Sequence, residues 1–349
     1  MRKPVVLITG AGGEIGHALV SRFASTDEPI ITLDLNPLDA TLAPMVSREF
    51  TGSITDTNLL ERMLAEFEVD RVFHLAALLS TRAEFTPVTA HHVNVQGTLN
   101  LLEFAQRQGE SHGRRVTFVY PSSIATYGLP DRAAKAAAGR VREDQYAHPK
   151  TMYGCNKLYC EELGRYYARY YKQLSFDVTP HVDFRCVRFP GLISATTMPA
   201  GGTSDYASEM IHAAARGLAY ECFVRPDTTV PFMAMPDAST ALLTLAAAPR
   251  DQLSRTTYNV GAFSRSAADI REVVVAAFPR AEITYRIDPK RQGIVDSWPA
   301  DVDDSPARAD WAFQPAYDFD RAFREYLIPT IRNYYKQVRP KAGIAHQSH

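Results

Sequence analysis

The fold is decided near the N-terminus by a short glycine-rich stretch, Thr9-Gly10-Ala11-Gly12-Gly13-Glu14-Ile15-Gly16. An apolar, β-branched run at residues 5–9 precedes it, and a helical pattern at 15–25 follows it. Glycines are needed where a chain turns tightly and where a helix packs closely on a strand. The free N–H groups at the start of such a helix attract phosphate. The stretch therefore predicts a strand, a phosphate-binding turn and a helix in succession.

A carboxylate at the end of the next predicted strand indicates which ligand this turn holds. Asp34 ends the run at 30–34, at the distance from the glycines where a carboxylate binds the ribose diol of a dinucleotide. It would repel the 2′-phosphate of NADP, and Leu35-Asn36 adds no arginine to offset that. We therefore predict NAD as the cofactor. The alternative is a plain turn, with Asp34 as a cap before Pro37.

Short apolar runs alternate with amphipathic helical patterns through the first half of the chain. The predicted strands are 5–9, 30–34, 71–75, 116–120 and 184–189, and the predicted helices are 15–25, 58–66, 98–107 and 153–171. This alternation is typical of right-handed βαβ units around a parallel sheet. We expect a Rossmann-type, doubly wound α/β fold with a smaller, mixed α/β C-terminal substrate-binding domain.

The second half of the chain is less regular. It shows an irregular loop at 194–204, helical patterns at 206–216, 237–247 and 266–278, and strand-like runs at 220–224 and 257–260. We assign residues 1–190 and 236–262 to an NAD-binding domain, 191–235 and 263–335 to a substrate-binding domain, and 336–349 to a disordered tail. Two stretches are interpreted as insertions that can reshape the substrate pocket, a surface insertion at 132–142 and a second insertion at 172–183.

The composition excludes several classes of protein. The 349 residues are 46% hydrophobic and 22% charged, which excludes a disordered chain. A net charge of -1 supplies no basic field for nucleic acid or an anionic membrane. The four cysteines lack the spacing of a disulfide framework or a metal site. No apolar run approaches the roughly 18 residues of a membrane span. We expect a soluble, cytoplasmic protein that binds a small molecule and no metal, nucleic acid or membrane.

A tyrosine and a lysine form the candidate catalytic pair. Tyr153 and Lys157 stand at i and i+4, on one face of a predicted helix. A free tyrosine, with a pKa near 10, is a poor base at neutral pH, but a neighbouring ammonium favours its phenolate. Ser122 and Ser123 end the predicted strand upstream, where parallel sheets place ligand contacts. A serine hydroxyl there can hydrogen-bond a substrate oxygen.

Taken together, these segments resemble the extended short-chain dehydrogenase/reductases, the superfamily of NAD-dependent epimerases and dehydratases. The matching segments are the glycine stretch, His74-Leu75-Ala76-Ala77, Asn94-Val95-Gln96-Gly97-Thr98, Ser122-Ser123 with Tyr127-Gly128, and Tyr153 with Lys157. The resemblance implies that Tyr153 is the general base, Lys157 its partner and a ribose ligand, and Ser123 the hydroxyl that orients the substrate. It implies cofactor contacts at Gly10, Gly12, Gly13, Glu14, Ile15, Gly16, Asp34, Ser53, Ile54, Leu75, Ala76, Ala77, Asn94, Tyr153 and Lys157. Ser53 stands where the family often has an aspartate.

Later segments are most similar to the short-chain type of L-threonine 3-dehydrogenase. They are 188–194, 201–207, 231–238 and 297–305. The resemblance implies oxidation of the C3 hydroxyl of L-threonine to 2-amino-3-ketobutyrate, and a homodimer. It implies substrate contacts at Ser80, Ser123, Tyr153, Gly191, Thr203 and Trp298. Three of these residues have a purely structural alternative to substrate binding. Ser80 can cap a helix, Thr203 can bond a neighbouring backbone group, and Trp298 can belong to the hydrophobic core.

The alternative function is a nucleotide-sugar 4-epimerase or dehydratase that uses tightly bound NAD. Residues 195–210 contain no lysine or arginine, which suits a small zwitterion better than a sugar diphosphate. Arg216, Arg225 and Arg291 are the cations that a diphosphate would need. A further alternative is an enzyme that oxidises another small hydroxy acid. Another is a non-enzymatic nucleotide sensor, although a sensor has no need of Ser123, Tyr153 and Lys157.

Overall fold

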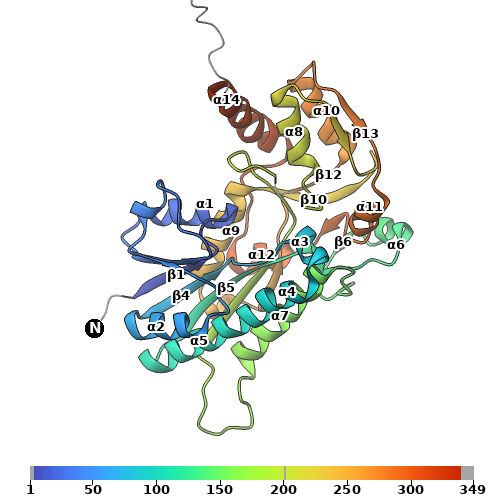
Figure 1. The fold of residues 1–349 in the computed structure, drawn as a ribbon. Coiled ribbons are helices and arrows are strands. Elements are labelled where there is room, and N and C mark those ends of the chain that lie inside the picture. Colours follow the sequence, from blue (N-terminus) through green and yellow to red (C-terminus); the bar gives the residue numbers. More distant parts are fainter. Residues whose placement is uncertain (1–3, 200–201, 339–349) are drawn as a thin grey trace, which may run out of the picture.

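The computed structural model describes residues 4–199 and 202–338, and a seven-stranded parallel sheet lies at its centre (Figure 1). Its strands are, in spatial order, β11 (Thr257–Asn259), β7 (Val182–Phe189), β5 (Val116–Ser123), β4 (Val69–His74), β1 (Val5–Thr9), β2 (Ile30–Asp34) and β3 (Arg48–Thr51). The strand order reverses between β1 and β4. In open α/β sheets, ligands bind outside the carboxyl ends of the strands at such a point. The predicted doubly wound fold is confirmed.

Helices cover both faces of this sheet, which explains why its inner strands are almost continuously apolar. One apolar cluster joins the sheet to α2 (Thr57–Glu66), α5 (Gly97–His112) and α7 (Met152–Arg169). The other joins it to α1 (Glu14–Phe23), α9 (Met235–Ala247) and α12 (Ser305–Trp311). Figure 1 shows α2, α5 and α7 on one side of the sheet and α1 and α9 on the other. The three layers leave only the strand ends open to ligands.

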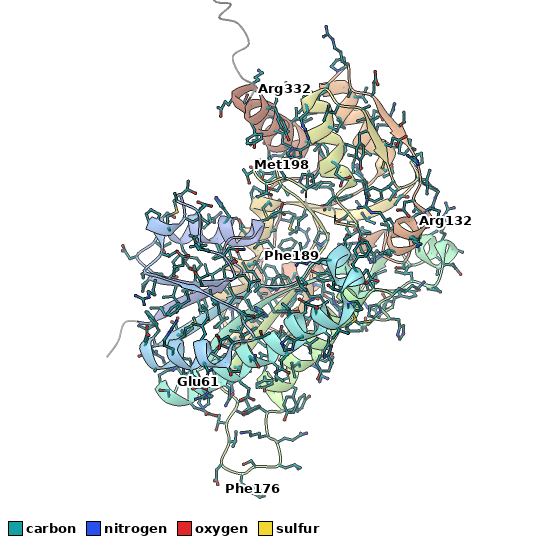
Figure 2. The ribbon with its side chains drawn as sticks, viewed as in Figure 1. Glu61, Arg132, Phe176, Phe189, Met198 and Arg332 are labelled. Atoms are coloured by element: carbon teal, nitrogen blue, oxygen red, sulfur yellow. The ribbon has the colours of Figure 1, made fainter. Side chains whose placement is uncertain are left out.

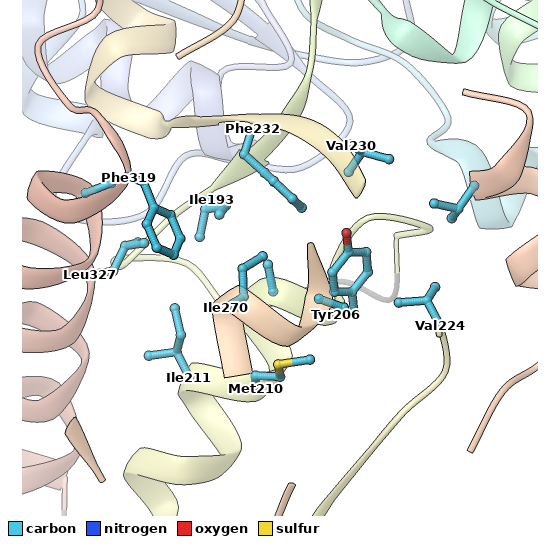
Figure 3. Close-up of a cluster of buried hydrophobic side chains, with 14 of the residues drawn as sticks. Ile193, Tyr206, Met210, Ile211, Val224, Val230, Phe232, Ile270, Phe319 and Leu327 are labelled. Atoms are coloured by element: carbon cyan, nitrogen blue, oxygen red, sulfur yellow. The ribbon is translucent and has the colours of Figure 1, made fainter. Parts of the chain in front are cut away.

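A third apolar cluster forms the core of the smaller C-terminal domain. It lies between a three-stranded mixed sheet, β12 (Phe263–Ser266), β10 (Thr229–Ala234) and β8 (Gly191–Ile193), and the helices α8 (Tyr206–Arg216), α10 (Ala267–Ala277) and α14 (Ile328–Val338). Figure 3 shows Ile193, Phe232, Ile270 and Phe319 converging in this core. A second, parallel pair of strands consists of β13 (Ile283–Tyr285) and β9 (Tyr220–Cys222). The expected mixed α/β character of this part is confirmed.

Short helices complete the chain. They are η1 (Ala43–Met45), α3 (Ser80–Phe85), α4 (Pro87–His91), the π-helix η2 (His92–Gln96), η3 (Ile124–Thr126), η4 (Arg250–Gln252), α11 (Pro289–Asp296), α13 (Phe319–Arg321) and the π-helix η5 (Ala322–Leu327). Helix α14 continues to Val338, so residues 336–338 of the predicted tail are helical, and the rest of that tail lies outside the described residues. Among the helices described, none is both long and apolar enough to cross a membrane.

Several short strands escaped the sequence analysis because they lack continuous apolar runs. Strand β3 has the sequence Arg48-Glu49-Phe50-Thr51, and only Phe50 is buried because the strand forms an edge of the sheet. Strand β10 contains a proline, Pro231, which argues against a strand in sequence reasoning. The small sheets of the C-terminal domain therefore depend on tertiary pairing.

The two predicted insertions lie in different places. Residues 132–142 form α6 (Arg132–Ala137) and β6 (Arg140–Val141), and β6 pairs with β14 (Asp301–Val302). Lys135 is buried, and its ammonium donates to the carbonyl oxygen of Val295 at 3.0 Å. The backbone N–H of the nearby Leu129 donates to the carbonyl oxygen of Ser297 at 2.8 Å. The stretch is therefore packed against the segment that carries Trp298, and is more than the surface insertion we predicted.

The other insertion is remote from the strand ends that face the ligand. Its residues 172–181 precede β7, whose opposite end at Phe189 leads toward Gly191. Figure 2 shows Phe176 at the tip of a loop that extends away from the body of the molecule, and its side chain is fully exposed. This loop does not reshape the substrate side.

Candidate active site

The glycine turn is shaped by two close backbone approaches. Gly10 has φ 69°, a left-handed conformation, and a Cβ added there would lie 2.7 Å from the backbone nitrogen of Ala76. A Cβ on Gly16 would lie 2.4 Å from the carbonyl oxygen of Gly10. Gly13, just before α1, carries no side chain that caps the helix. The N–H groups of Glu14 and its neighbours therefore face a turn that a phosphate can enter.

Asp34 meets this turn directly. The backbone N–H of Gly12 donates to Asp34 Oδ2 at 3.0 Å, and that of Asn36 donates to Oδ1 at 3.3 Å. The carboxylate is thus held at the end of β2, beside the phosphate-binding turn. A glycine cradle with an adjacent carboxylate fits a dinucleotide whose ribose diol is unmodified.

Replacing Asp34 with alanine is expected to weaken the preference for NAD over NADP. Removing the carboxylate abolishes both the diol contact and the repulsion of a 2′-phosphate, so the ratio of the two Kd values should change at least about tenfold, or about 1.4 kcal/mol. Calorimetric titration with each dinucleotide measures this ratio. Asp177→Ala removes the same charge from the exposed 172–181 loop and should leave it unchanged. An unchanged ratio in Asp34→Ala would contradict the assignment.

The predicted adenine contacts are held by local bonds. The Ser53 hydroxyl lies 2.8 Å from Thr55 Oγ1 and accepts a hydrogen bond from the Thr55 N–H at 3.1 Å. The side chain of Ser53 is therefore hydrogen-bonded within its own turn. The Ile54 side chain packs on Gly97 at the start of α5, where an added Cβ would lie 2.4 Å from Ile54 Cδ1. Asn100 Nδ2 donates to the carbonyl oxygen of Ile54 at 3.2 Å. The segment is fixed beside the sheet edge, and its role as an adenine contact stays a prediction.

The segment Leu75-Ala76-Ala77 crosses in front of the glycine turn and is fastened at both ends. Its first two N–H groups donate to Thr9, to the carbonyl oxygen at 3.1 Å and to Oγ1 at 3.3 Å. Asn94 accepts the N–H of Leu78 at 2.7 Å and donates to its carbonyl oxygen at 3.0 Å. Asn94 is buried in the π-helix η2. Asn94 thus ties this segment to η2, and its role as a cofactor contact stays a prediction.

His74, at the end of β4, is a buried polar link behind this segment. Its Nδ1 lies 2.8 Å from Thr9 Oγ1 and its Nε2 lies 2.9 Å from Thr98 Oγ1. Burial, and to a smaller extent the charge of Lys157, lowers the pKa of His74 to about 3. The ring is therefore neutral in the folded protein at neutral and mildly acidic pH.

Acidification is therefore expected to destabilise the fold through His74. Between its unfolded pKa of about 6.5 and its folded pKa of about 3, the unfolded chain binds the proton and the folded one does not, so stability rises with pH and is lost as pH falls. The slope is about 1.4 kcal/mol per pH unit. Urea unfolding of His74→Gln between pH 6 and 4.5 should show a shallower decline than the wild type. His91→Gln, at an exposed position, should keep the wild-type slope.

Tyr153 lies in the first turn of α7, against the end of β5. Gly154 permits this, since a Cβ added there would lie 2.0 Å from the carbonyl oxygen of Ala125. The N–H of Ala125 in turn donates to Ser123 Oγ at 3.1 Å. The close approach brings the helical turn of Tyr153 next to the turn that starts at Ser123. That the two side chains act on one substrate stays a prediction.

Burial sets the charge states of the catalytic pair. It raises the pKa of the Tyr153 phenol above its ordinary value and lowers the pKa of Lys157 to about 8. Lys157 Nζ donates to the carbonyl oxygen of Pro121 at 2.7 Å and lies 4.3 Å from the ring centroid of Tyr120 and 5.5 Å from that of Tyr153. We expected the ammonium to lower the Tyr153 pKa. That expectation is wrong here, because burial dominates and Lys157 is bound to the end of β5.

A buried ion pair, which the sequence analysis missed, distinguishes the two serines. Ser122 donates to Glu161 Oε1 at 2.5 Å, and Arg188 donates to Glu161 Oε2 at 2.6 Å. The side chains of Arg188 and Glu161 are only 4% and 3% exposed. Ser122 is therefore committed to this network, which leaves Ser123 as the serine predicted to orient the substrate. The sequence feature that could have revealed this ion pair is helical spacing, because Glu161 stands one further i, i+4 step beyond Lys157 on the same helix face.

On the substrate side, two predicted contacts meet across the domains. Thr203 is buried just before α8, and Ser80 stands at the start of α3. The Thr203 hydroxyl donates to Ser80 Oγ at 3.4 Å. Gly191 packs against Phe232, and its added Cβ would lie 3.3 Å from Ser204 Cβ. Trp298 is buried in the C-terminal core cluster, against which Tyr153 also packs. The structure brings Ser80 and Thr203 together, and places Trp298 in a core position.

The sequence that builds this geometry matches a known family. The NAD dependent epimerase/dehydratase family matches residues 6–261, which is most of the chain and includes the glycine turn, Ser123 and the Tyr153–Lys157 helix. The chain belongs to this family. It is therefore an enzyme of the NAD-dependent epimerase/dehydratase kind, and the predicted family resemblance is confirmed.

Relatives within the family cover nearly the whole chain. Mitochondrial L-threonine 3-dehydrogenase of Bos taurus is 34% identical over 335 residues, which is 95% of this chain and 82% of the relative. An uncharacterized epimerase/dehydratase of Staphylococcus aureus is 36% identical over 318 residues, 90% of this chain and 92% of the relative. The X-ray structure of L-threonine dehydrogenase from Clostridium difficile has a TM-score of 0.83 at 32% identity, covering 96% of this chain and 99% of its own.

Other predictions about the family member remain open to experiment. The bovine relative is described as mitochondrial, so a cytoplasmic location stays a prediction for this chain, as does the homodimer. No group of three or more His, Cys, Asp or Glu side chains capable of holding a metal ion occurs in residues 4–199 and 202–338.

Proposed function

We propose that this enzyme oxidises the C3 hydroxyl of L-threonine, or of a closely related small β-hydroxy acid, to 2-amino-3-ketobutyrate or its analogue. The observation that carries the proposal is the approach of Thr203 to Ser80 at 3.4 Å. Two small neutral hydroxyls from the two domains converge there, which suits a short polar substrate rather than a sugar diphosphate. The L-threonine dehydrogenases among its relatives support the same substrate.

In the proposed reaction, the residues of this chain orient the substrate and move its proton. Ser123 holds the C3 hydroxyl, and Tyr153 accepts the hydroxyl proton as general base. NAD, when bound, supplies the nicotinamide ring that accepts the hydride from C3. Because burial raises the pKa of Tyr153, its phenolate fraction, and with it the rate of oxidation, grows as pH rises. Lys157, held by Pro121, supplies a fixed positive charge below a pH of about 8 and a donor for a ribose hydroxyl.

The alternative, a nucleotide-sugar 4-epimerase or dehydratase, needs cations for a diphosphate, and two of the three counted in the sequence are engaged elsewhere. Arg225 forms a two-pronged pair with Asp296 at 2.7 and 3.0 Å. Arg291 donates to the carbonyl oxygen of Gly202 at 2.9 Å and stacks on Phe223. Arg216 is exposed at the end of α8. These contacts favour the small substrate.

Turnover with a substrate panel tests the proposal. Purified enzyme is mixed with NAD and, separately, with L-threonine, L-allo-threonine, L-serine, 3-hydroxybutyrate and UDP-sugars, while NADH absorbance is followed. We expect NADH to accumulate fastest with L-threonine. Accumulation should be slowest with the hydroxy acids that lack the amino group or the methyl group of L-threonine. Epimerised UDP-sugar without NADH from any hydroxy acid would reject the proposal in favour of the alternative.

A further inference from the structure

Arg291 ties separate parts of the C-terminal domain together through contacts that include a ring and a backbone carbonyl. Its guanidinium carbon lies 3.4 Å from the ring centroid of Phe223, which follows strand β9. Its Nη2 donates to the carbonyl oxygen of Gly202 at 2.9 Å. A planar guanidinium can stack on a ring and donate in its own plane at the same time, which an ammonium cannot do. Arg291 thus holds Gly202 against helix α11.

Gly202 belongs to a tight turn that leads into α8. The N–H of Gly202 donates to Asp205 Oδ2 at 2.6 Å, and the N–H of Asp205 donates to the carbonyl oxygen of Gly202 at 3.2 Å. A Cβ added at Gly202 would lie 2.7 Å from Asp205 Oδ1, so no other residue fits there without movement. The position of this turn is therefore defined by Asp205 from within and by Arg291 from outside.

The residue after Gly202 is Thr203, the substrate-side hydroxyl that meets Ser80. Thr203 is only 5% exposed, and its backbone is continuous with the carbonyl group that Arg291 holds. A shift of the Gly202 carbonyl therefore moves Thr203 relative to Ser80. Since hydrogen bonds weaken steeply with distance and angle, and this one already spans 3.4 Å, small shifts suffice to break it.

We propose that Arg291 is a positioning residue that sets the affinity for the small hydroxy substrate by fixing Gly202 and hence Thr203. The inference rests on the proposed function for the identity of the substrate. It differs from the role that a sugar diphosphate would give this arginine, because here the guanidinium acts on the protein backbone and not on a ligand. It leaves the dinucleotide turn and the Ser123–Tyr153 pair untouched.

Arg291→Lys and Arg291→Met test this inference, with Lys290→Met on the exposed side of the same helix as the matched control. In both Arg291 variants we expect KM for L-threonine to rise about tenfold, with KM for NAD and kcat changed less than about twofold. A purely structural role would lower the apparent kcat together with the folded fraction and leave both KM values unchanged. Hydrogen–deuterium exchange of a peptide covering 202–210 should be faster in both variants and unchanged in Lys290→Met.

The two readouts separate the inference from the function on which it rests. If wild-type enzyme does not oxidise L-threonine, the proposed function fails, and the exchange measurement, which needs no substrate, still decides the positioning role. Unchanged exchange at 202–210 in both Arg291 variants overturns the inference. Faster exchange with KM for the oxidised substrate unchanged overturns it as well, because the turn would then not govern affinity.

Discussion

Replacing Tyr153 with phenylalanine is expected to lower kcat for L-threonine oxidation by about 10²–10⁴-fold, the range that a positioned general base contributes. Only the phenolic oxygen is lost, and the ring keeps its place against the C-terminal core cluster. The Kd for NAD, measured by calorimetric titration, should stay within about threefold of wild type, since the glycine turn and Asp34 remain. The loss should appear in kcat far more than in KM.

Tyr159→Phe is the matched control for this prediction. Tyr159 lies on the same helix, α7, and is exposed, so its hydroxyl faces solvent. Its variant should retain wild-type kcat across the pH range. Residual activity of Tyr153→Phe near that of Tyr159→Phe would show that another group takes the proton. A wild-type rate that falls between pH 6 and 7, below the range in which Lys157 loses its proton, would also contradict a base whose pKa is raised by burial.

Truncating Glu161 to alanine is expected to lower the free energy of unfolding by about 3–5 kcal/mol, because it leaves a buried guanidinium without its partner. Arg188 donates to both oxygens of Glu161 and to the carbonyl oxygen of Glu143 at 2.9 Å, and it stacks 4.8 Å from the ring centroid of Tyr127. Ser122 also loses its acceptor. Urea unfolding, monitored by tryptophan fluorescence, measures the change.

Two comparisons make the ion-pair argument specific. Glu221→Ala removes a carboxylate that pairs with Arg286 on the surface, where both side chains are more than half exposed, and should cost less than about 1 kcal/mol. The double variant Glu161→Met with Arg188→Met removes both buried charges and should recover part of the lost stability. Equal effects of Glu161→Ala and Glu221→Ala would refute the buried-charge explanation.

Much of the site follows from spacing along the chain. The glycine stretch, Asp34 and the Tyr153–Lys157 pair are local patterns, since each depends on one turn, one strand end or one helix face. Sequence reasoning therefore placed these residues where the structure has them. The choice of Ser123 over Ser122 came from the family resemblance, and its physical cause, the bond from Ser122 to Glu161, joins residues far apart in sequence.

The charge states illustrate a different limit. Adjacency at i and i+4 suggested that Lys157 lowers the pKa of Tyr153, but adjacency does not reveal how deeply either group is buried. Desolvation depends on the third cluster and on strand β5, which only the folded chain brings to α7. A short-range pattern thus placed Tyr153 and Lys157 on one face of α7 and gave the wrong direction for the pKa shift of Tyr153.

The sequence by itself determined the Rossmann-type fold, the glycine turn and the helix face that carries Tyr153 and Lys157, because these depend on periodicities and spacings within single βαβ units. Only the tertiary structure decided how the substrate side is assembled. Thr203 meets Ser80, Arg291 reaches Gly202, and β6 pairs with β14 across long separations in the chain. Such contacts are set by tertiary packing within and between the two domains, and no local pattern encodes the distance between two groups that packing alone brings together.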